Sequence, residues 1–140
     1  MRTSARNVLA GTIAWITPGA VNGEVGLSIG GKVDIVSIIT QQSIADLRLK
    51  VGMAAKALIP SSFVILAKGS GFRTSARNHI PAKVAERRDG AVNSEIALNI
   101  GAGQPLVSTI TIASADHLDL KAGDEVIALI KAPHIIIAVE

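Results

Sequence analysis

The residues of this chain best suited to chemistry form a short block of donors, Thr-Ser-Ala-Arg-Asn, which occurs at positions 3–7 and again at 74–78. Each copy carries two hydroxyls, a guanidinium and an amide just ahead of a β-rich run. Arginine presents a fixed fork of N–H donors, and hydroxyls with backbone N–H groups can complete a nest around tetrahedral oxygens. The block therefore predicts an oxyanion site. The alternative is a polar turn in which the asparagine caps the strand entry.

A second repeated block is Gly-Ala-Val-Asn, at positions 19–22 and 90–93. Its small residues let backbone N–H groups approach a partner closely, which suits an anion or a packed interface. A tight turn before a strand at 24–27 explains the same spacing, and spacing alone favours that turn.

Paired hydroxyls form a third repeated pattern. Thr40 and Ser43 stand three residues apart at the end of a predicted strand, and Thr111 and Ser114 repeat them. Hydroxyls at this spacing can bind an oxyanion, but capping of the following helical turn explains the serine without any ligand.

The two copies differ at one position that bears charge. Lys131 and Ala132 follow the predicted strand at 125–130, whereas the aligned residues of the first copy are Pro60 and Ser61. A lone lysine is usually a solvated surface residue. Lys131 therefore matters to an anion only where it faces the Ser-Ala-Arg block.

The sequence offers few groups of residues that could act together in catalysis. His79, His117 and His134 are unrepeated and lack metal-ligand spacing. Glu24 and Glu95 follow the Gly-Ala-Val-Asn blocks and look like strand residues. The chain contains no cysteine, which removes thiolate metal sites and a cysteine nucleophile. We therefore expect a protein that is not an enzyme and has neither an organic cofactor nor a bound metal cation.

A tandem repeat organises these motifs. Arg2–Asn7 matches Arg73–Asn78 residue for residue at an offset of 71, and the Gly-Ala-Val-Asn blocks keep the same offset. Two identical blocks in one register indicate duplication. The Gly/Ser stretch at 69–71 predicts a linker between one module at 1–68 and a second at 72–140.

Within each copy, short β-rich runs are punctuated by glycine and proline, a spacing that predicts a barrel or sandwich. In the first copy these runs are 8–16, 33–40, 54–59 and 64–67. A short helical turn is expected at Ser43–Leu47, capped by Ser43 and with Asp46 in its first turn, and Ser114–Leu118 repeats it.

The amino-acid composition limits the kinds of molecule that the protein is expected to bind. Hydrophobic residues make up 49% of the chain, but only Trp15, Phe63 and Phe72 are aromatic, so the core must consist of aliphatic side chains. The net charge of +3 favours anions without the dense basic runs of a nucleic-acid binder. Binding of single-stranded nucleic acid usually needs aromatic platforms. We therefore expect no nucleic-acid partner.

The basic and apolar start of the chain could be misread as a secretory leader. The same opening block recurs inside the chain, so it belongs to a folded module. No run reaches the roughly 18 apolar residues that span a bilayer. The sequence therefore predicts a soluble, cytoplasmic protein with no membrane partner.

Taken together, the motifs resemble the Mop or TOBE family. Thr-Ser-Ala-Arg-Asn, Gly-Ala-Val-Asn, Ile-Thr-x-x-Ser, Leu-x-Leu-Lys-x-Gly and, in the second copy, Ile-Lys-Ala-Pro occur in the family's order. With two copies, the chain is similar to tandem di-Mop molybdate-binding proteins. This resemblance implies an all-β fold of two tandem OB-like five-stranded barrels, each with a short helical turn. It also implies binding of molybdate and tungstate for intracellular molybdenum storage and homeostasis.

The resemblance also implies a homotrimer whose oxyanions lie at module and subunit interfaces. Pro60 departs from the family lysine, so we expect two unequal classes of site, the stronger using Lys131. Residues predicted at one kind of site are Ser4, Ala5, Arg6, Asn7, Thr40, Ser43, Ser61, Ser75, Ala76, Arg77, Asn78, Thr111, Ser114, Lys131 and Ala132. Residues predicted at a second kind, near the symmetry axis, are Gly19, Ala20, Val21, Asn22, Gly90, Ala91, Val92 and Asn93.

Two other functions remain open at this point. One is a regulatory module that senses the oxyanion and acts on a partner protein. The other is an OB-fold nucleic-acid binder, supported by the basic pI and the repeated arginine. Binding of a pterin, which the family's historical name suggests, is weakened by the scarcity of aromatic residues.

Overall fold

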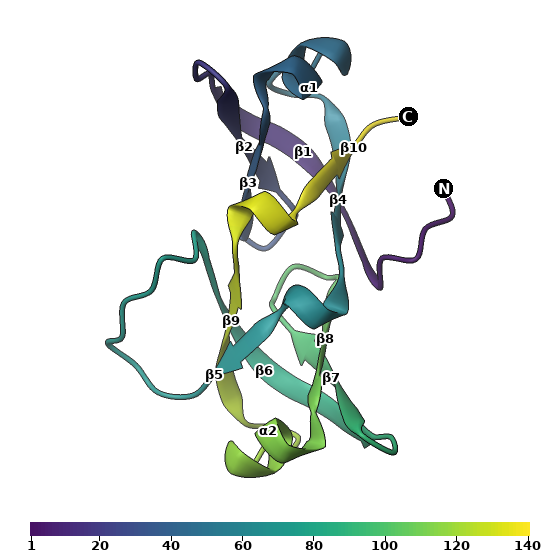
Figure 1. Ribbon diagram of the computed structural model, residues 1–140, viewed down its shortest axis with the longest axis vertical. Helices are drawn as coiled ribbons and strands as arrows, with labels where there is room; N and C mark the ends of the chain where they lie inside the picture. The colour runs from purple at the N-terminus through teal and green to yellow at the C-terminus, as the bar shows by residue number, and fades with distance from the viewer.

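The computed structural model describes all 140 residues and contains two five-stranded antiparallel sheets, stacked end to end (Figure 1). In the first repeat the elements are β1 (Asn7–Thr17), β2 (Asn22–Ser28), β3 (Asp34–Thr40), α1 (Gln41–Asp46), β4 (Ala54–Ile59), the 3₁₀ turn η1 (Ser61–Phe63) and β5 (Ile65–Ala67). In the second repeat they are β6 (Asn78–Asp89), β7 (Asn93–Asn99), β8 (Pro105–Thr111), α2 (Ile112–His117), β9 (Glu125–Ile130), η2 (Ala132–His134) and β10 (Ile136–Ala138). The predicted all-β fold of two barrel modules is confirmed.

The strands alternate between buried and exposed residues because one face of each sheet lines a core. In β1, for example, Leu9 and Ile13 are buried while Val8 and Thr12 face outward. A shift of register between Ile13 and Trp15 marks a bulge that bends the long strand, so that β1 pairs with β4 along one part and with β2 along the other. Strand β6 has the same shift between Val84 and Glu86.

The last strand of each repeat pairs with the other repeat. The strand orders are β10-β4-β1-β2-β3 and β5-β9-β6-β7-β8, so β5 joins the sheet of the second repeat and β10 joins that of the first. Figure 1 shows the exchange by colour, with the yellow β10 among blue strands and the teal β5 among green ones. Each barrel therefore contains four strands of one repeat and one of the other. The repeat in the sequence and the barrel in space are different units.

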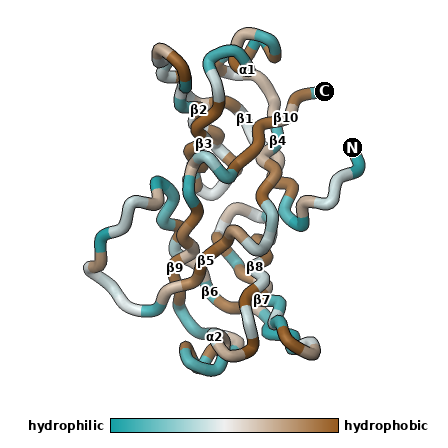
Figure 2. Tube along the Cα trace, in the orientation of Figure 1, coloured by the Kyte–Doolittle hydropathy of each residue, from teal (hydrophilic) through white to brown (hydrophobic).

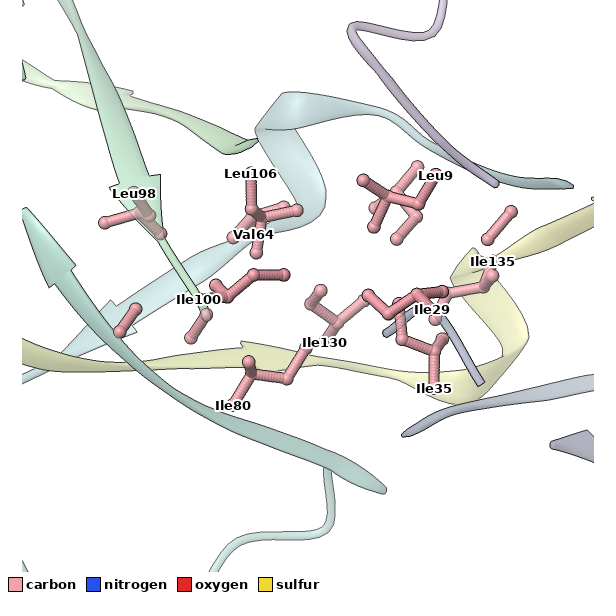
Figure 3. Packing of buried hydrophobic residues seen from close by; sticks show 14 of the residues in the cluster. Leu9, Ile29, Ile35, Val64, Ile80, Leu98, Ile100, Leu106, Ile130 and Ile135 are labelled. Atoms are coloured by element: carbon pink, nitrogen blue, oxygen red, sulfur yellow. The ribbon is translucent and has the colours of Figure 1, made fainter. Parts of the chain in front are cut away.

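One continuous core runs through both barrels. A single cluster of 27 buried aliphatic residues includes residues from all ten strands. Figure 3 shows Ile29, Ile35 and Ile135 of one barrel meeting Ile130 and Ile80 of the other. In Figure 2 the hydrophobic colour follows the strands, whereas α2 and the segment between β5 and β6 are mainly hydrophilic or neutral. The two barrels are therefore parts of one packed body.

The helical turns begin earlier than expected. Thr40, not Ser43, is the N-cap of α1, because its hydroxyl accepts a hydrogen bond from the Ser43 backbone N–H at 3.0 Å. The helix accordingly starts at Gln41, and Asp46 is its last residue rather than part of its first turn. Thr111 caps α2 in the same way, so the expectation of a serine cap was wrong at both helices.

The hairpin tips of the two barrels touch where the barrels meet. A Cβ placed on Gly31, which has a φ of +58°, would lie 1.8 Å from the carbonyl oxygen of Gly101. Only glycine has room there and adopts this backbone conformation without strain. Beside this contact Gln104 donates to the carbonyls of Ala10 and Ile29 at 2.8 and 3.1 Å. The tips thus lock the barrels together.

Candidate functional sites where the barrels meet

The asparagine of each Thr-Ser-Ala-Arg-Asn block is a structural residue that ties the barrels together. The Asn7 amide is buried, donates to the carbonyls of Ile59 and Val107 at 3.1 and 2.8 Å, and accepts from the Val107 N–H at 2.7 Å. Asn78 makes the equivalent bonds to Ile130 and Val36. Both side-chain N–H groups are used within the chain. The geometry therefore assigns these two amides to the contact between barrels, although both asparagines were predicted at the anion.

The residues just before each asparagine form an exposed turn. The Thr3 hydroxyl accepts from the Ala5 N–H at 3.1 Å, and Thr74 does the same for Ala76. This local hydrogen bond fixes the turn and leaves the neighbouring Ser4 exposed. The turn presents the serine and the following arginine to solvent, at the surface beside the junction of the barrels.

Each arginine of these blocks reaches the opposite repeat. Arg6 forms an ion pair with Glu95 on β7 at 2.7 Å, and Arg77 pairs with Glu24 on β2. About half of each arginine side chain is exposed, 53% for Arg6 and 47% for Arg77. The glutamates therefore orient the guanidinium groups while leaving part of each fork free. Reasoning from the sequence had treated Glu24 and Glu95 only as strand residues.

The surroundings of Arg6 contain hydroxyls. Glu95 lies directly opposite Thr109 in the β7–β8 ladder, and the Thr109 hydroxyl is 2.7 Å from that of Ser61. One step beyond the last β1–β4 pair, Asn7 with Ile59, the register brings the backbone of Arg6 alongside Pro60. We call Arg6, Glu95, Thr109, Ser61 and Pro60 the Arg6 cluster.

The surroundings of Arg77 carry a second cation instead. Asn78 pairs with Ile130, so the same step places the backbone of Arg77 alongside Lys131. Glu24 lies opposite Ile38 in the β2–β3 ladder. Arg77, Glu24, Ile38, Ala132 and Lys131 make up the Arg77 cluster, which occupies the positions equivalent to the Arg6 cluster. Counting formal charges, the Arg6 cluster is neutral and the Arg77 cluster has one excess positive charge.

The other predicted residues gather elsewhere. Asn22 pairs with Thr40, and the Gln41 N–H donates to the Val21 carbonyl at 2.7 Å, so each Gly-Ala-Val-Asn turn packs against the cap of the helix in its own repeat. Val21 is 73% exposed and its counterpart Val92 is 70% exposed. The hydroxyls of Thr40 and Ser43 lie 2.8 Å apart, and those of Thr111 and Ser114 lie 2.9 Å apart.

Within one chain the two groups of predicted residues do not meet. The turns and caps lie toward the outer ends of the molecule with α1 and α2, and the arginine blocks lie nearer the middle (Figure 1). No hydrogen bond joins a Ser-Ala-Arg turn to Thr40, Ser43, Thr111 or Ser114. The Arg6 and Arg77 clusters are therefore the sites that the single chain itself assembles.

The histidines are dispersed and have separate local contacts. His134 stacks on Phe63 with ring centroids 4.3 Å apart, and these two residues occupy equivalent positions in the two repeats. His79 lies 2.7 Å from the Thr74 hydroxyl, and His117 is exposed in the last turn of α2. No group of three or more His, Cys, Asp or Glu residues is arranged to hold a metal ion.

An open groove lies between β5 and β8, the edge strands of the second sheet. It has a volume of about 690 Å³, and its lining includes Ile65, Ile110, Thr111 and Ser114. Its polar lining includes Thr111 and Ser114 of the α2 cap and Thr109 of the Arg6 cluster, so the groove adjoins residues of both groups. No helix is long and apolar enough to cross a membrane.

The fold and sites define the chain as a tandem pair of OB-type barrels with duplicated arginine clusters where the barrels meet. The TOBE domain model matches residues 3–66 and 74–137, so the chain belongs to the TOBE domain family.

Comparison with individual proteins agrees with this family. The chain is 41% identical over 140 residues to the molybdenum-pterin-binding protein MopB of Rhodobacter capsulatus, covering 99% of this chain and 52% of MopB. It is 37% identical over 141 residues to the molybdenum transport protein ModE of Herbaspirillum seropedicae, covering 100% of this chain and 52% of ModE. It thus spans about half the length of these curated relatives.

A solved structure matches the whole fold. The crystal structure of ModG, described as a cytoplasmic molybdate-binding protein with molybdate bound, is 36% identical to this chain. It superimposes with a TM-score of 0.95, and the match covers 100% of both chains.

Proposed function

We propose that this protein binds molybdate, and tungstate almost equally, as a store that buffers the intracellular oxyanion. The observation that carries the proposal is the pair of equivalent arginine clusters in a fold that matches molybdate-bound ModG over its full length. Molybdate is a tetrahedral dianion, so charge-assisted hydrogen bonds from arginine, lysine, hydroxyls and backbone N–H groups suffice to hold it. No proton transfer or bond cleavage is required, so we propose a binding protein rather than an enzyme, acting in the cytoplasm.

The anion is proposed to lie where the Ser-Ala-Arg turns meet the opposite repeat. Ser4, Arg6 and Ser61 are exposed or half-buried on that surface, and Ser75, Arg77 and Lys131 are exposed at the equivalent place. Sulfate shares the shape and charge of molybdate but is smaller. Selectivity should therefore come mainly from the size of the cavity.

A homotrimer would complete these sites. Thr40, Ser43 and their counterparts lie away from the arginine clusters in one chain, so a neighbouring subunit is needed to bring the two groups together. The exposed valines of the Gly-Ala-Val-Asn turns support contact between subunits at the second kind of site. Shared sites would also link molybdate binding to assembly by mass action.

The test is calorimetric titration of the anion-free protein with molybdate, tungstate and sulfate, alongside the Lys131→Ala variant. We expect saturable molybdate binding, little sulfate binding, and loss of the tighter class of site in the variant, because its cluster loses the excess positive charge. Lys50→Ala, at an exposed lysine outside both clusters, is the control. Absence of molybdate binding would overturn the proposal. Unchanged affinity in Lys131→Ala would reject the assignment of the tighter site.

A sensing module is the second candidate, and one observation favours it. ModE, which carries a region similar to this entire chain, is about twice as long, so the tandem barrels also occur as part of a larger protein. A store releases molybdate without a partner. A sensor should instead associate with a second protein in a molybdate-dependent pull-down.

A further inference from the structure

The two arginine clusters differ at three positions, and the three differences lie together. Pro60, Ser61 and Thr109 of the Arg6 cluster correspond to Lys131, Ala132 and Ile38 of the Arg77 cluster. The arginine, its glutamate partner and the neighbouring asparagine are identical in both. The loss of a lysine thus coincides with the gain of two hydroxyls that contact each other.

Pro60 removes more than a charge. It has no side-chain donor, and its ring nitrogen carries no N–H, so this position offers an oxyanion neither a cation nor a backbone hydrogen bond. It precedes η1 with a φ of −58°, an angle that proline adopts without strain. Donors in this part of the Arg6 cluster must therefore come from neighbouring residues.

The Ser61–Thr109 pair has a donor to spare. The two hydroxyl oxygens are 2.7 Å apart, and neither has another hydrogen-bond partner in the chain. Two hydroxyls carry two protons, and only one is needed for the bond between them. The second proton can point outward, on the face of the sheet where Glu95 stands opposite Thr109 and holds Arg6. In the Arg77 cluster Ala132 and Ile38 have no side-chain donor.

We propose that the Ser61–Thr109 hydroxyl pair is an anion-binding element of the Arg6 cluster that supplies uncharged hydrogen-bond donors in place of the missing lysine. This inference rests on the proposed function and adds Thr109 to the site. One chain then contributes the same arginine–glutamate frame to two molybdate sites that differ by one positive charge. Because Lys131 adds a full positive charge beside the dianion, whereas the hydroxyl donors are uncharged, the Arg6 site is the weaker site.

The two sites should also differ in their response to salt. Added ions screen the attraction between charges, and the Arg77 site has one cation more than the Arg6 site. Raising the salt concentration should therefore weaken the Arg77 site more and bring the two affinities closer together. A hydroxyl pair keeps its directional hydrogen bonds under these conditions.

The experiment is molybdate titration of the full chain and of the double variant Ser61→Ala/Thr109→Ile, which installs the residues of the Arg77 cluster. We expect the weaker class to lose about tenfold or more in affinity, because one charge-assisted hydrogen bond contributes about that much. The tighter class should be unchanged. Ser62→Ala, at an exposed hydroxyl next to the pair, is the matched control.

A second variant tests the same idea by gain of function. Pro60→Lys in the wild-type background should strengthen the weaker class and increase its salt dependence toward that of the tighter class. This measurement does not require the double variant to fold. Thermal unfolding checks whether the double variant is folded. If wild-type protein binds no molybdate, the proposed function itself fails. If it binds two classes and neither variant changes the weaker one, only the role of the hydroxyl pair is overturned.

Discussion

The helices α1 and α2 occupy equivalent places in the two repeats but are attached to their barrels by different interactions. In the first barrel the buried Ile44 of α1 packs over Gly23 on β2, where an added Cβ would lie 2.5 Å from the Ile44 Cδ1 atom. In the second barrel Ala115 and Ser94 stand at the corresponding positions. The first repeat thus places a large side chain over a glycine, whereas the second places a small side chain over a serine.

Arg87 holds α2 by hydrogen bonds and ion pairs, in place of the apolar contact that Ile44 provides for α1. It reaches from β6 to the carbonyls of Ala115 and Leu120 at 3.3 and 3.1 Å, and it pairs with Asp116 at 2.6 Å and Asp89 at 2.9 Å. Its counterpart in the first repeat is Ile16, which packs against the core. The same fold position can thus be held by aliphatic packing or by a hydrogen-bonded ion network. These two solutions should respond differently to mutation, salt and pH.

The largest expected effect is on the aliphatic side of this comparison. Ile44→Ala should lower the free energy of unfolding by about 2–5 kcal/mol, because it removes buried methylene groups and leaves a cavity over Gly23. Urea denaturation gives this value. Adding Gly23→Ser, the residue of the second repeat, should recover part of the loss by filling space. A double variant no more stable than Ile44→Ala would contradict this account of the packing.

A smaller effect is expected on the ionic side. Arg87→Met should reduce the amide protection of α2, because the carbonyls of Ala115 and Leu120 lose their donor. It should also remove the dependence of that protection on salt. Arg88→Met is the control, since Arg88 is 69% exposed and pairs only with Glu86. Equal loss of protection in α1 and α2, measured by hydrogen exchange, would show that the network does not act locally.

The smallest expected difference between the two helices is the loss of amide protection at low pH. The hydrogen bond from Arg87, followed by that from Ser94, lowers the pKa of Asp89 below its ordinary value of 3.8. A carboxylate with a lowered folded pKa contributes stability above its unfolded pKa and loses it as pH falls through the folded value. Below about pH 4, protection of the N–H of Leu118, the C-cap of α2, should therefore drop more than that of Leu47, the C-cap of α1. The opposite order would reverse the comparison.

Much of the fold could be predicted from the sequence because its signals are local. Alternating burial, the glycine and proline breaks and the 71-residue offset predict the strands at 8–16, 33–40, 54–59 and 64–67, and the structure contains them within a few residues. The helix start was misplaced because Thr40 and Ser43 both can cap a helix. Only the backbone geometry decides which hydroxyl accepts the hydrogen bond.

The exchange of strands could not be predicted. The last strands of the two repeats have nearly the same short apolar sequence, Ile65-Leu66-Ala67 and Ile136-Ile137-Ala138. Either one could therefore pair at the edge of either sheet. Sequence pattern cannot distinguish pairing within a repeat from pairing between repeats. The choice depends on the path of the chain after η1 and η2.

The candidate sites were only partly visible in the sequence. Arg6 and Arg77 stood out because they are repeated, but their partners Glu95 and Glu24 lie in the opposite repeat, far away along the chain. Thr109 was missed because it aligns with an isoleucine and looks like an ordinary strand residue. The available signal was that Thr109 and Ser61 depart from the repeat together.

The exchanged strands give the tandem arrangement a further meaning. A single repeat expressed alone could keep this exchanged arrangement only by giving its last strand to another molecule and accepting one in return. Joining the two repeats through residues 68–71 makes that encounter intramolecular, so completion of the barrels no longer depends on protein concentration. The covalent connection also frees the partners from being identical. A self-complementary pair of separate chains must place the same residue on both sides of its axis, whereas this chain can place Phe63 against His134 and keep one lysine instead of two.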